Sequence, residues 1–238
     1  MGLKKFFDYA GILKDAALTF AALAAGFWLF GAYQGCSKSF DRPRVNPVVR
    51  YAEFGKRINK ANINTTSKKE NLLEQLIEKY ACELKSGRMN PKYEYNDNFN
   101  HDNELMLLAR MVFGEARNQP FEAMIGVAYT AVNRARIGSW YGKDLHDVLL
   151  KPWQYSCFNK NDPNRKKLMN PLKYEKPEIF AKCLAVAYAV LNGFVEDPTG
   201  GATHYFSGNR KPGWARKMEE CGKIGDFRFY KEGRTVRK

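Results

Sequence analysis

Residues 104–117 read ELMLLARMVFGEAR and form a largely apolar segment that ends in Glu115-Ala116-Arg117. The first ten residues are apolar apart from Glu104 and Arg110, which predicts a helix buried in a core. Glu115 follows directly, ahead of a loop that Pro120 bounds. A carboxylate that emerges from an apolar wall loses solvation, which favours its protonated form and suits it to donate a proton. Taken alone, a glutamate at a helix end is more often solvated or paired, here with Arg117.

The segments downstream predict further helices and two short strands. The strongest pattern has proline at its first turn, an Ala/Leu/Val body and glycine just past its end, as helices prefer. In chain order we expect helices at 121–135 and 177–192, a short helical or extended run at 145–150, and strands at 202–206 and 227–230. The fold class is therefore α+β and mainly helical, with a small β-sheet, in a domain over residues 101–238.

One window near the N-terminus differs from the rest of the chain. Residues 16–35 read AALTFAALAAGFWLFGAYQG, without a charge, and about twenty apolar residues suffice to cross a bilayer as a helix. We interpret residues 1–36 as a signal anchor with a transmembrane helix. The domain over residues 101–238 would then lie outside the cytoplasm, in the periplasm or at the cell surface. The alternatives are a cleaved signal peptide with a secreted product, and a buried core helix.

Residues 37–100 have the composition of a basic connector. Within it, residues 68–85 place leucine, isoleucine and tyrosine at three- and four-residue spacing, which predicts an amphipathic helix. We expect this helix to pack on the main domain or on a partner. The cysteines leave two alternatives open, two disulfides outside the cytoplasm or free buried thiols; those after the window are Cys82, Cys157, Cys183 and Cys221.

The charge of the chain is strongly positive. Lys and Arg total 39 against 25 Asp and Glu, a formal charge of +14, and nearly all of the excess follows the hydrophobic window. A basic balance predicts anionic surroundings such as nucleic acid, lipid or wall polymers. Because no RNP, zinc-finger or helix-turn-helix signature is present, we expect no nucleic-acid partner. Neither a zinc-protease spacing nor a phosphate-binding glycine loop is found, so we expect no metal and no cofactor.

Several short motifs occur in a fixed order after residue 109. They are Gly114-Glu115-Ala116-Arg117, Asn133-Arg134, Trp153-Gln154-Tyr155-Ser156, Gly201-Ala202-Thr203-His204-Tyr205, Pro212-Gly213-Trp214 and Ile224-Gly225-Asp226-Phe227. This series resembles the SleB-like cell-wall hydrolases of the spore cortex-lytic type, over roughly residues 104–230. Tyr155 stands where that family usually has Phe. Asp226 stands where it has His, which puts any role of that His in doubt here.

The resemblance implies a lysozyme-like or lytic-transglycosylase-like fold with a cleft for peptidoglycan glycan strands. It also implies one catalytic glutamate, Glu115, which cuts between N-acetylmuramic acid and N-acetylglucosamine. Around the sugar we place polar groups and apolar rings, and each of them has a structural alternative, such as a helix cap, a turn or a core position. These predicted substrate-binding residues are Asn133, Trp153, Gln154, Tyr155, Ser156, His204, Tyr205 and Trp214.

One carboxylate is enough for lytic transglycosylation, because the C6 hydroxyl of muramic acid attacks intramolecularly. Glycosidases that use water commonly pair two carboxylates. The carboxylates that leave a lysozyme-like hydrolase open as an alternative are Asp144, Asp147, Asp162 and Glu175. A second alternative is a non-catalytic, cationic wall-binding module. We expect a monomer that meets glycan strands and, through its N-terminal helix, the membrane. Bacterial wall remodelling, germination and phage lysis or entry are equally compatible roles.

Overall fold

Four long helices build the core of the part that the structure describes. This computed structural model describes residues 66–233; the predicted anchor at 16–35 and the first half of the predicted connector lie outside the described residues. The long helices are α3 (Thr66–Lys85), α4 (Glu104–Ala116), α5 (Phe121–Ile137) and α9 (Pro177–Leu191). Between α5 and α9 lie α6 (Leu145–Leu150), η1 (Ser156–Phe158), α7 (Arg165–Met169) and α8 (Pro171–Tyr174).

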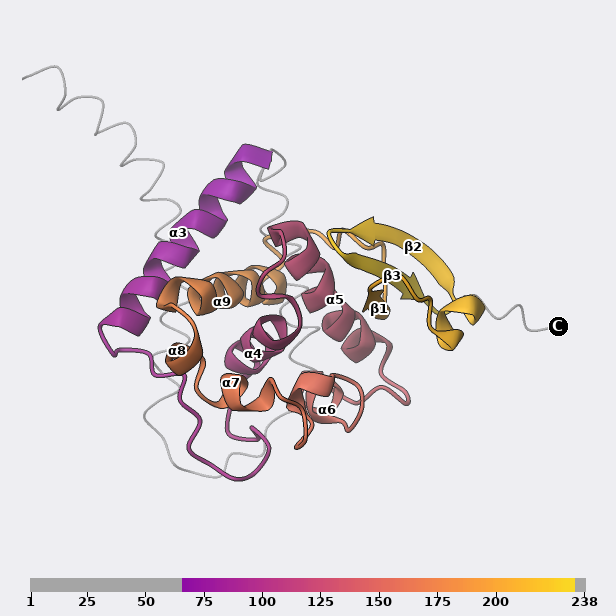
Figure 1. Cartoon of the computed structure of the whole chain (residues 1–238). Coiled ribbons are helices and arrows are strands. Elements are labelled where there is room, and N and C mark those ends of the chain that lie inside the picture. The colour runs from indigo at the N-terminus through magenta and orange to yellow at the C-terminus, as the bar shows by residue number, and fades with distance from the viewer. Residues whose placement is uncertain (1–65, 234–238) are drawn as a thin grey trace, which may run out of the picture. The chain divides into compact units, whose positions relative to one another are not determined.

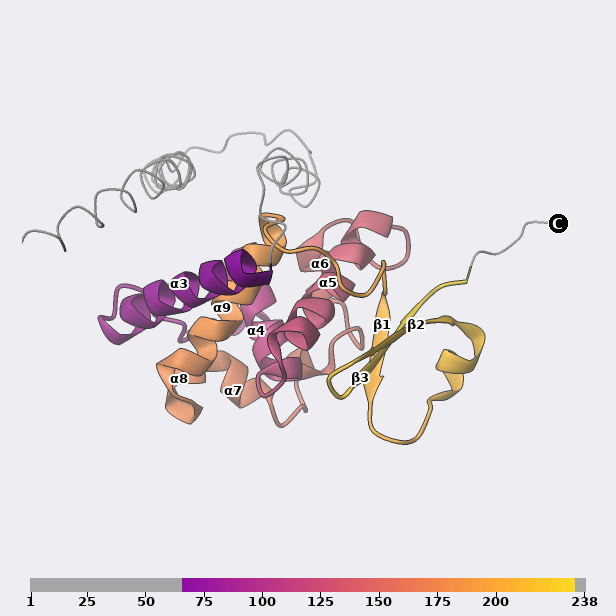
Figure 2. The same ribbon diagram turned by 90° about the horizontal axis from the view of Figure 1, so that it is seen from above.

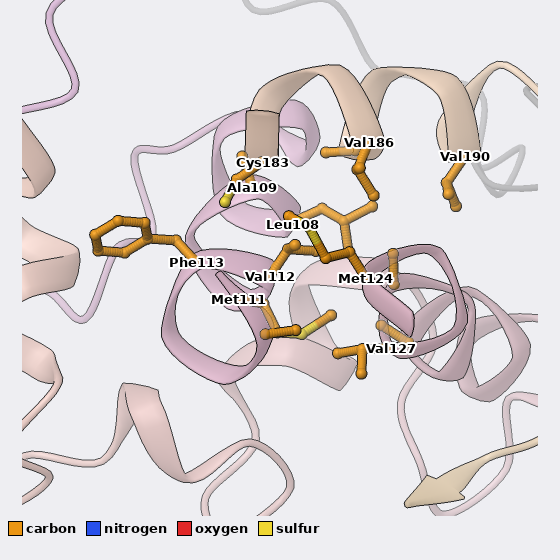
Figure 3. Packing of buried hydrophobic residues seen from close by; sticks show 14 of the residues in the cluster. Leu108, Ala109, Met111, Val112, Phe113, Met124, Val127, Cys183, Val186 and Val190 are labelled. Carbon is orange, nitrogen blue, oxygen red and sulfur yellow. The ribbon is translucent and has the colours of Figure 1, made fainter. Parts of the chain in front are cut away.

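Helix α4 lies at the centre of the core, as its sequence predicts. It begins where the side chain of Asn103 accepts a hydrogen bond from the Met106 amide at 2.9 Å, which satisfies one of the free donors of the first turn. Figure 3 shows its apolar side chains between those of α9 and α5. Leu108 and Val112 of α4 and Val186 of α9 are fully buried. Burial of such side chains is the main favourable contribution to folding.

Arg110 is the buried charged residue in the middle of this helix. Its side chain is 2% exposed and forms a salt bridge of 2.6 Å with Asp102, whose side chain is 9% exposed. The guanidinium also donates hydrogen bonds to the backbone carbonyls of Pro91, at 2.8 Å, and of Leu168. A buried charge is tolerated when it is paired and hydrogen-bonded in this way. Arg110 therefore connects α4 to the segment before it and to α7.

Helix α3 is the amphipathic helix predicted at about 68–85. It packs along α9, and its buried residues include Leu73, Leu76 and Tyr80. The Tyr80 ring meets Tyr188 of α9 edge to face, and Lys85 and Glu178 form an exposed salt bridge. Figures 1 and 2 show the two helices lying side by side. The second part of the predicted connector thus contributes to the same core as α4.

The sheet has three antiparallel strands in the order β1-β3-β2. The strands are β1 (His204–Ser207), β2 (Glu219–Ile224) and β3 (Phe227–Lys231), and the 3₁₀ helix η2 (Gly213–Lys217) precedes β2. Both views place the sheet beside α5, on the side away from α3 and α8 (Figures 1 and 2). Gly126 makes this packing possible, because a Cβ there would lie 2.9 Å from Cζ of Phe229.

These elements confirm a mainly helical fold with a small sheet, and they differ from the prediction in detail. Strand β2 and the short helix α7 were not predicted. All four cysteines among the described residues are free thiols. Within residues 66–233 no helix is both long enough and apolar enough to span a bilayer.

Candidate active site

Glu115 lies in the last turn of α4, where the helix leaves the core. Its carboxylate accepts two hydrogen bonds from neutral donors, the hydroxyl of Tyr205 to Oε2 at 3.1 Å and the backbone amide of Cys157 to Oε1 at 3.4 Å. Arg117 does not pair with it, because Arg117 forms a salt bridge of 3.2 Å with Glu175. Within the described residues no salt bridge involves Glu115, so the two neutral donors hold the carboxylate in place.

Gly114 allows the segment after Trp153 to reach Glu115. A Cβ at Gly114 would lie 2.7 Å from Cβ of Cys157 and 3.0 Å from Cδ1 of Leu168, closer than real carbon atoms approach. Because glycine has no side chain, η1 lies directly against the last turn of α4. The Gly-Glu order in the motif therefore places the amide of Cys157 at the carboxylate.

Tyr205 reaches Glu115 from strand β1. Its ring packs against Phe227 at 5.2 Å and Phe229 at 6.0 Å between centroids. Burial, followed by the charge of Glu115, raises the pKa of Tyr205 well above its usual value of 10. The phenol consequently stays protonated and acts as a hydrogen-bond donor. The structure thus brings the predicted residues Glu115 and Tyr205 into direct contact.

The amides of Asn133 and Gln154 are engaged inside the protein. Asn133 donates to Asp197 Oδ2 at 2.8 Å and to the carbonyl of Ala202 at 3.0 Å, which fixes the turn that leads into β1. Gln154 donates to the carbonyl of Tyr141 at 2.5 Å. Both side chains therefore position backbone near the site, a structural role rather than the sugar contact predicted for them.

The three other residues of the Trp-Gln-Tyr-Ser motif have different exposures. Tyr155 is 2% exposed and its hydroxyl bonds Thr130 Oγ1 at 3.1 Å, so its ring face is not available to a sugar, contrary to the prediction. Trp153 is 86% exposed and has a positive φ of 68°, which is uncommon for a bulky residue. Ser156 is exposed and adjoins Cys157. Trp153 and Ser156 are thus exposed in the segment that carries the Cys157 amide to Glu115.

His204 and Trp214 lie on the other face of the sheet from Tyr205. Successive side chains of a strand point to opposite faces, and the His204 ring packs on Trp214 at 5.3 Å, together with Phe206 and Tyr230. Burial, and then the charge of Arg134, lowers the pKa of His204 to about 4, so the ring is neutral at pH 7. The structure does not bring these two predicted residues to the Glu115 side of the sheet.

Asp226, which stands where the resembling family has His, belongs to the turn between β2 and β3. Its carboxylate accepts a hydrogen bond of 2.8 Å from the Gln119 side chain, and its amide donates to Gln119 Oε1 at 3.3 Å. The pair attaches the turn to the loop that follows Glu115. Asp226 therefore has a structural contact with this loop and no hydrogen bond to Glu115.

Two surface hollows of the described residues lie away from Glu115. Two hollows, of about 620 Å³ and 440 Å³, lie at α3 and at α6, and Glu115 lines neither. Among residues 66–233 no group of three His, Cys, Asp or Glu side chains could hold a metal ion. The candidate site therefore consists of Glu115 and the groups that donate hydrogen bonds to it, the Tyr205 hydroxyl and the Cys157 amide.

Two contributors to the site were not among the predicted residues. Cys157 acts through its backbone amide, which every residue except proline possesses, so no sequence signal could identify it. Arg134 was visible in the Asn-Arg motif, and its side chain contacts the segments on both sides of the site. The available signal was its position directly after Asn133 in that motif.

Comparison with known proteins agrees with the motifs. Residues 118–230, just after Glu115, match the protein family described as Cell Wall Hydrolase. The spore cortex-lytic enzyme of Halalkalibacterium halodurans is 27% identical over 129 residues, which are 54% of this chain and 34% of that enzyme. The chain therefore spans about a third of the length of this curated relative. These two matches confirm the resemblance to SleB-like cell-wall hydrolases.

Two solved structures are also similar to this chain. The catalytic domain of the Bacillus cereus SleB protein is 24% identical, with a TM-score of 0.42 over 58% of this chain and 93% of that domain. The catalytic domain of the germination-specific lytic transglycosylase SleB from Bacillus anthracis has the same identity and TM-score over 58% of this chain and 97% of its own length.

Proposed function

We propose that this chain is a peptidoglycan-cleaving enzyme, a lytic transglycosylase with a lysozyme-like catalytic domain that uses Glu115 as its single general acid and base. The observation that carries the proposal is the setting of Glu115. Its carboxylate lies at the end of a largely apolar helix and is oriented by two neutral donors, the Tyr205 hydroxyl and the Cys157 amide. The match to cell-wall hydrolases supplies the substrate class.

The proposed reaction needs one proton donor that later accepts a proton. Protonated Glu115 gives its proton to the glycosidic oxygen as the bond from that oxygen to the anomeric carbon of the muramic acid breaks. The C6 hydroxyl of the same muramic acid then bonds to the anomeric carbon and loses its proton to Glu115, which restores the starting state. The Tyr205 hydroxyl and the Cys157 amide stabilise the carboxylate between the two transfers.

The exposed residues of the segment that contacts Glu115 are suited to a sugar. Trp153 offers an open ring on which a pyranose could stack, and Ser156 adds a hydroxyl next to Cys157. The aromatic residues on the far face of the sheet, His204 and Trp214, are not needed for this step. The proposal therefore places the glycan against the η1 segment, between Trp153 and Tyr205.

A hydrolase that uses water is the second candidate, and it requires another carboxylate. The four carboxylates considered for that role have other partners. Asp144 caps α6 through the Asp147 amide, and Asp147 accepts from the Lys143 amide. Asp162 accepts from the Asn164 amide, and Glu175 pairs with Arg117. These contacts favour the single-carboxylate reaction.

Digestion of purified peptidoglycan tests both candidates. We expect the wild type to release fragments that end in anhydro-muramic acid, and Glu115→Gln to release none while it unfolds at the same denaturant concentration. Glu175→Gln is a matched control that changes a neighbouring carboxylate and should keep the product. Reducing muramic ends would favour the hydrolase, and full activity of Glu115→Gln would reject the assignment. Binding without any product would indicate the wall-binding module.

We further propose that residues 16–35 anchor the chain in a membrane, with the catalytic domain outside the cytoplasm. The support is the length and the apolar composition of this window. Carbonate washing of membranes, with mass spectrometry of the N-terminus, separates the outcomes. An intact N-terminus in the washed membrane fraction is expected, whereas a shortened soluble product would indicate cleavage and secretion.

A further inference from the structure

Arg134 of α5 is buried without a carboxylate partner. The residue is 6% exposed, and within the described residues no salt bridge involves it. Its guanidinium lies over the rings of Tyr155 and Tyr141, with Cζ at 4.8 Å and 5.5 Å from the centroids. A buried charge is costly unless it is fully hydrogen-bonded, so the hydrogen-bond partners of this side chain must compensate for its lost solvation.

The hydrogen bonds of Arg134 divide between two segments that are distant in sequence. Nε donates to the carbonyl of Thr203 at 2.7 Å. Nη1 donates to the carbonyl of Gln154 at 3.3 Å and to its side-chain Oε1 at 3.2 Å. One planar group therefore connects the start of β1 to the segment before η1.

These two segments carry the two donors to Glu115. Thr203 is two residues before Tyr205, whose hydroxyl bonds Oε2, and Gln154 is three residues before Cys157, whose amide bonds Oε1. A change in the position of either segment would lengthen one of these hydrogen bonds. The distance between the Tyr205 hydroxyl and the Cys157 amide thus depends on the guanidinium that connects their segments.

We propose that Arg134 is a positioning residue for the reaction, which sets the two donors of Glu115 by joining their segments. This inference rests on the proposed function of Glu115. It also explains why arginine stands here, because a planar fork with several donors can serve three acceptors at once, whereas the single ammonium of lysine cannot do so in the same plane.

Arg134→Lys and Arg134→Gln test the proposal on the full chain, with soluble glycan strands from peptidoglycan as substrate. Misplacement of reacting groups by about 1 Å can cost about a hundredfold in rate, so we expect kcat to fall ten- to a hundredfold and KM to stay within about twofold. Arg136→Gln is the matched control, because Arg136 lies on the same helix, is exposed and should leave both constants unchanged.

Two readouts separate positioning from a loss of stability. The first is the division of the loss between the two constants, because a misplaced carboxylate lowers kcat and kcat/KM together and leaves KM nearly unchanged. The second is a double substitution: in the Tyr205→Phe background Arg134→Lys should cost less than it does in the wild type, since both act on the same carboxylate. A folded Arg134→Lys enzyme with kcat within threefold of the wild type, a loss that lies entirely in KM, or fully additive losses would each overturn the proposal.

The control of the proposed function is run in the same assay. If Glu115→Gln is inactive and Arg134→Lys is fully active, only the positioning role fails. If Glu115→Gln keeps full activity, the proposed function fails and the role of Arg134 fails with it. A loss that follows the unfolded fraction in every Arg134 variant, and that disappears at a temperature where all are folded, would assign Arg134 to stability alone.

Discussion

The hydroxyl of Tyr205 and the carboxylate of Glu115 are joined by a hydrogen bond of 3.1 Å across 90 residues of sequence. Tyr205→Phe removes this donor and keeps the ring against Phe227 and Phe229. A hydrogen bond to a charged group contributes about 1.5–3 kcal/mol, so we expect kcat to fall about ten- to a hundredfold in peptidoglycan digestion. Tyr230→Phe is the control, because the Tyr230 hydroxyl bonds Glu220 instead. Equal activity of Tyr205→Phe and wild type would contradict the role of this bond.

Gly114→Ala should harm both stability and activity. The new methyl group would lie 2.7 Å from Cβ of Cys157, and relief of such overpacking costs about 1–3 kcal/mol. The relaxation would displace the Cys157 amide from Glu115. Urea unfolding and digestion rates measure the two effects. Gly213→Ala, where a Cβ would meet no atom within 4 Å, should change neither, and a stable, active Gly114→Ala would show that the contact is not needed.

Arg110→Met should be the most destabilising of these changes. It leaves Asp102 without its salt-bridge partner and two backbone carbonyls without a donor, and loss of one partner of a buried pair costs about 3–5 kcal/mol. The midpoint of urea unfolding should fall accordingly. By contrast, Lys92→Ala breaks only the exposed pair with Glu94 and should change stability by less than about 1 kcal/mol. Similar midpoints for both variants would refute the prediction.

Glu104 should make the protein less stable as the pH rises. Its Oε2 atom is buried without a hydrogen-bond partner among the described residues, and burial, opposed by the charge of His146, raises the pKa of Glu104 from 4.5 to about 7. The folded state therefore holds this proton more tightly than the unfolded state, and the stability that it provides is lost between about pH 4.5 and 7. The free energy of unfolding of Glu104→Gln, measured in urea, should rise relative to that of the wild type as the pH increases through this window. A constant difference would exclude this origin.

His204 should act in the opposite direction. Its pKa falls from 6.5 to about 4, mainly through burial, so the unfolded state binds the proton more tightly. Stability should consequently be lost as the pH drops from about 6.5 to 4. His204→Asn removes the titrating group, and its midpoint relative to the wild type should rise as the pH falls through this window. If the two proteins lose stability in parallel, another group is responsible.

The helices with strong apolar patterns could be predicted from the sequence. Helix α4 has an almost uninterrupted apolar segment, and α9 has proline and glycine at its ends, so local signals agreed with the core that forms. Strand β2 could not be predicted in the same way. Its sequence EECGKI alternates weakly, most of its side chains are exposed, and its register shifts between Glu220 and Gly222. Pairing with β3 determines its conformation.

The candidate site was predictable only in part. Glu115 and Tyr205 were both predicted as site residues from the motifs that resemble the family, and the structure joins them by a hydrogen bond. Sequence order could not tell which face of β1 each residue occupies, and the register with β3 places His204 beside Trp214 and Tyr205 beside Glu115. Nor could it show that Tyr155 is buried, since an aromatic residue serves equally well in a core or in a sugar platform.

The packing of α3 on α9 sets a practical limit on how the chain can be shortened. A chain cut at residue 101, where the predicted domain begins, would lose Leu73, Leu76 and Tyr80 and leave the apolar side of α9 open to water. Such a patch favours association between molecules. Recombinant versions without the N-terminal window should therefore start before residue 66. Helix α3 then remains in the protein and covers α9.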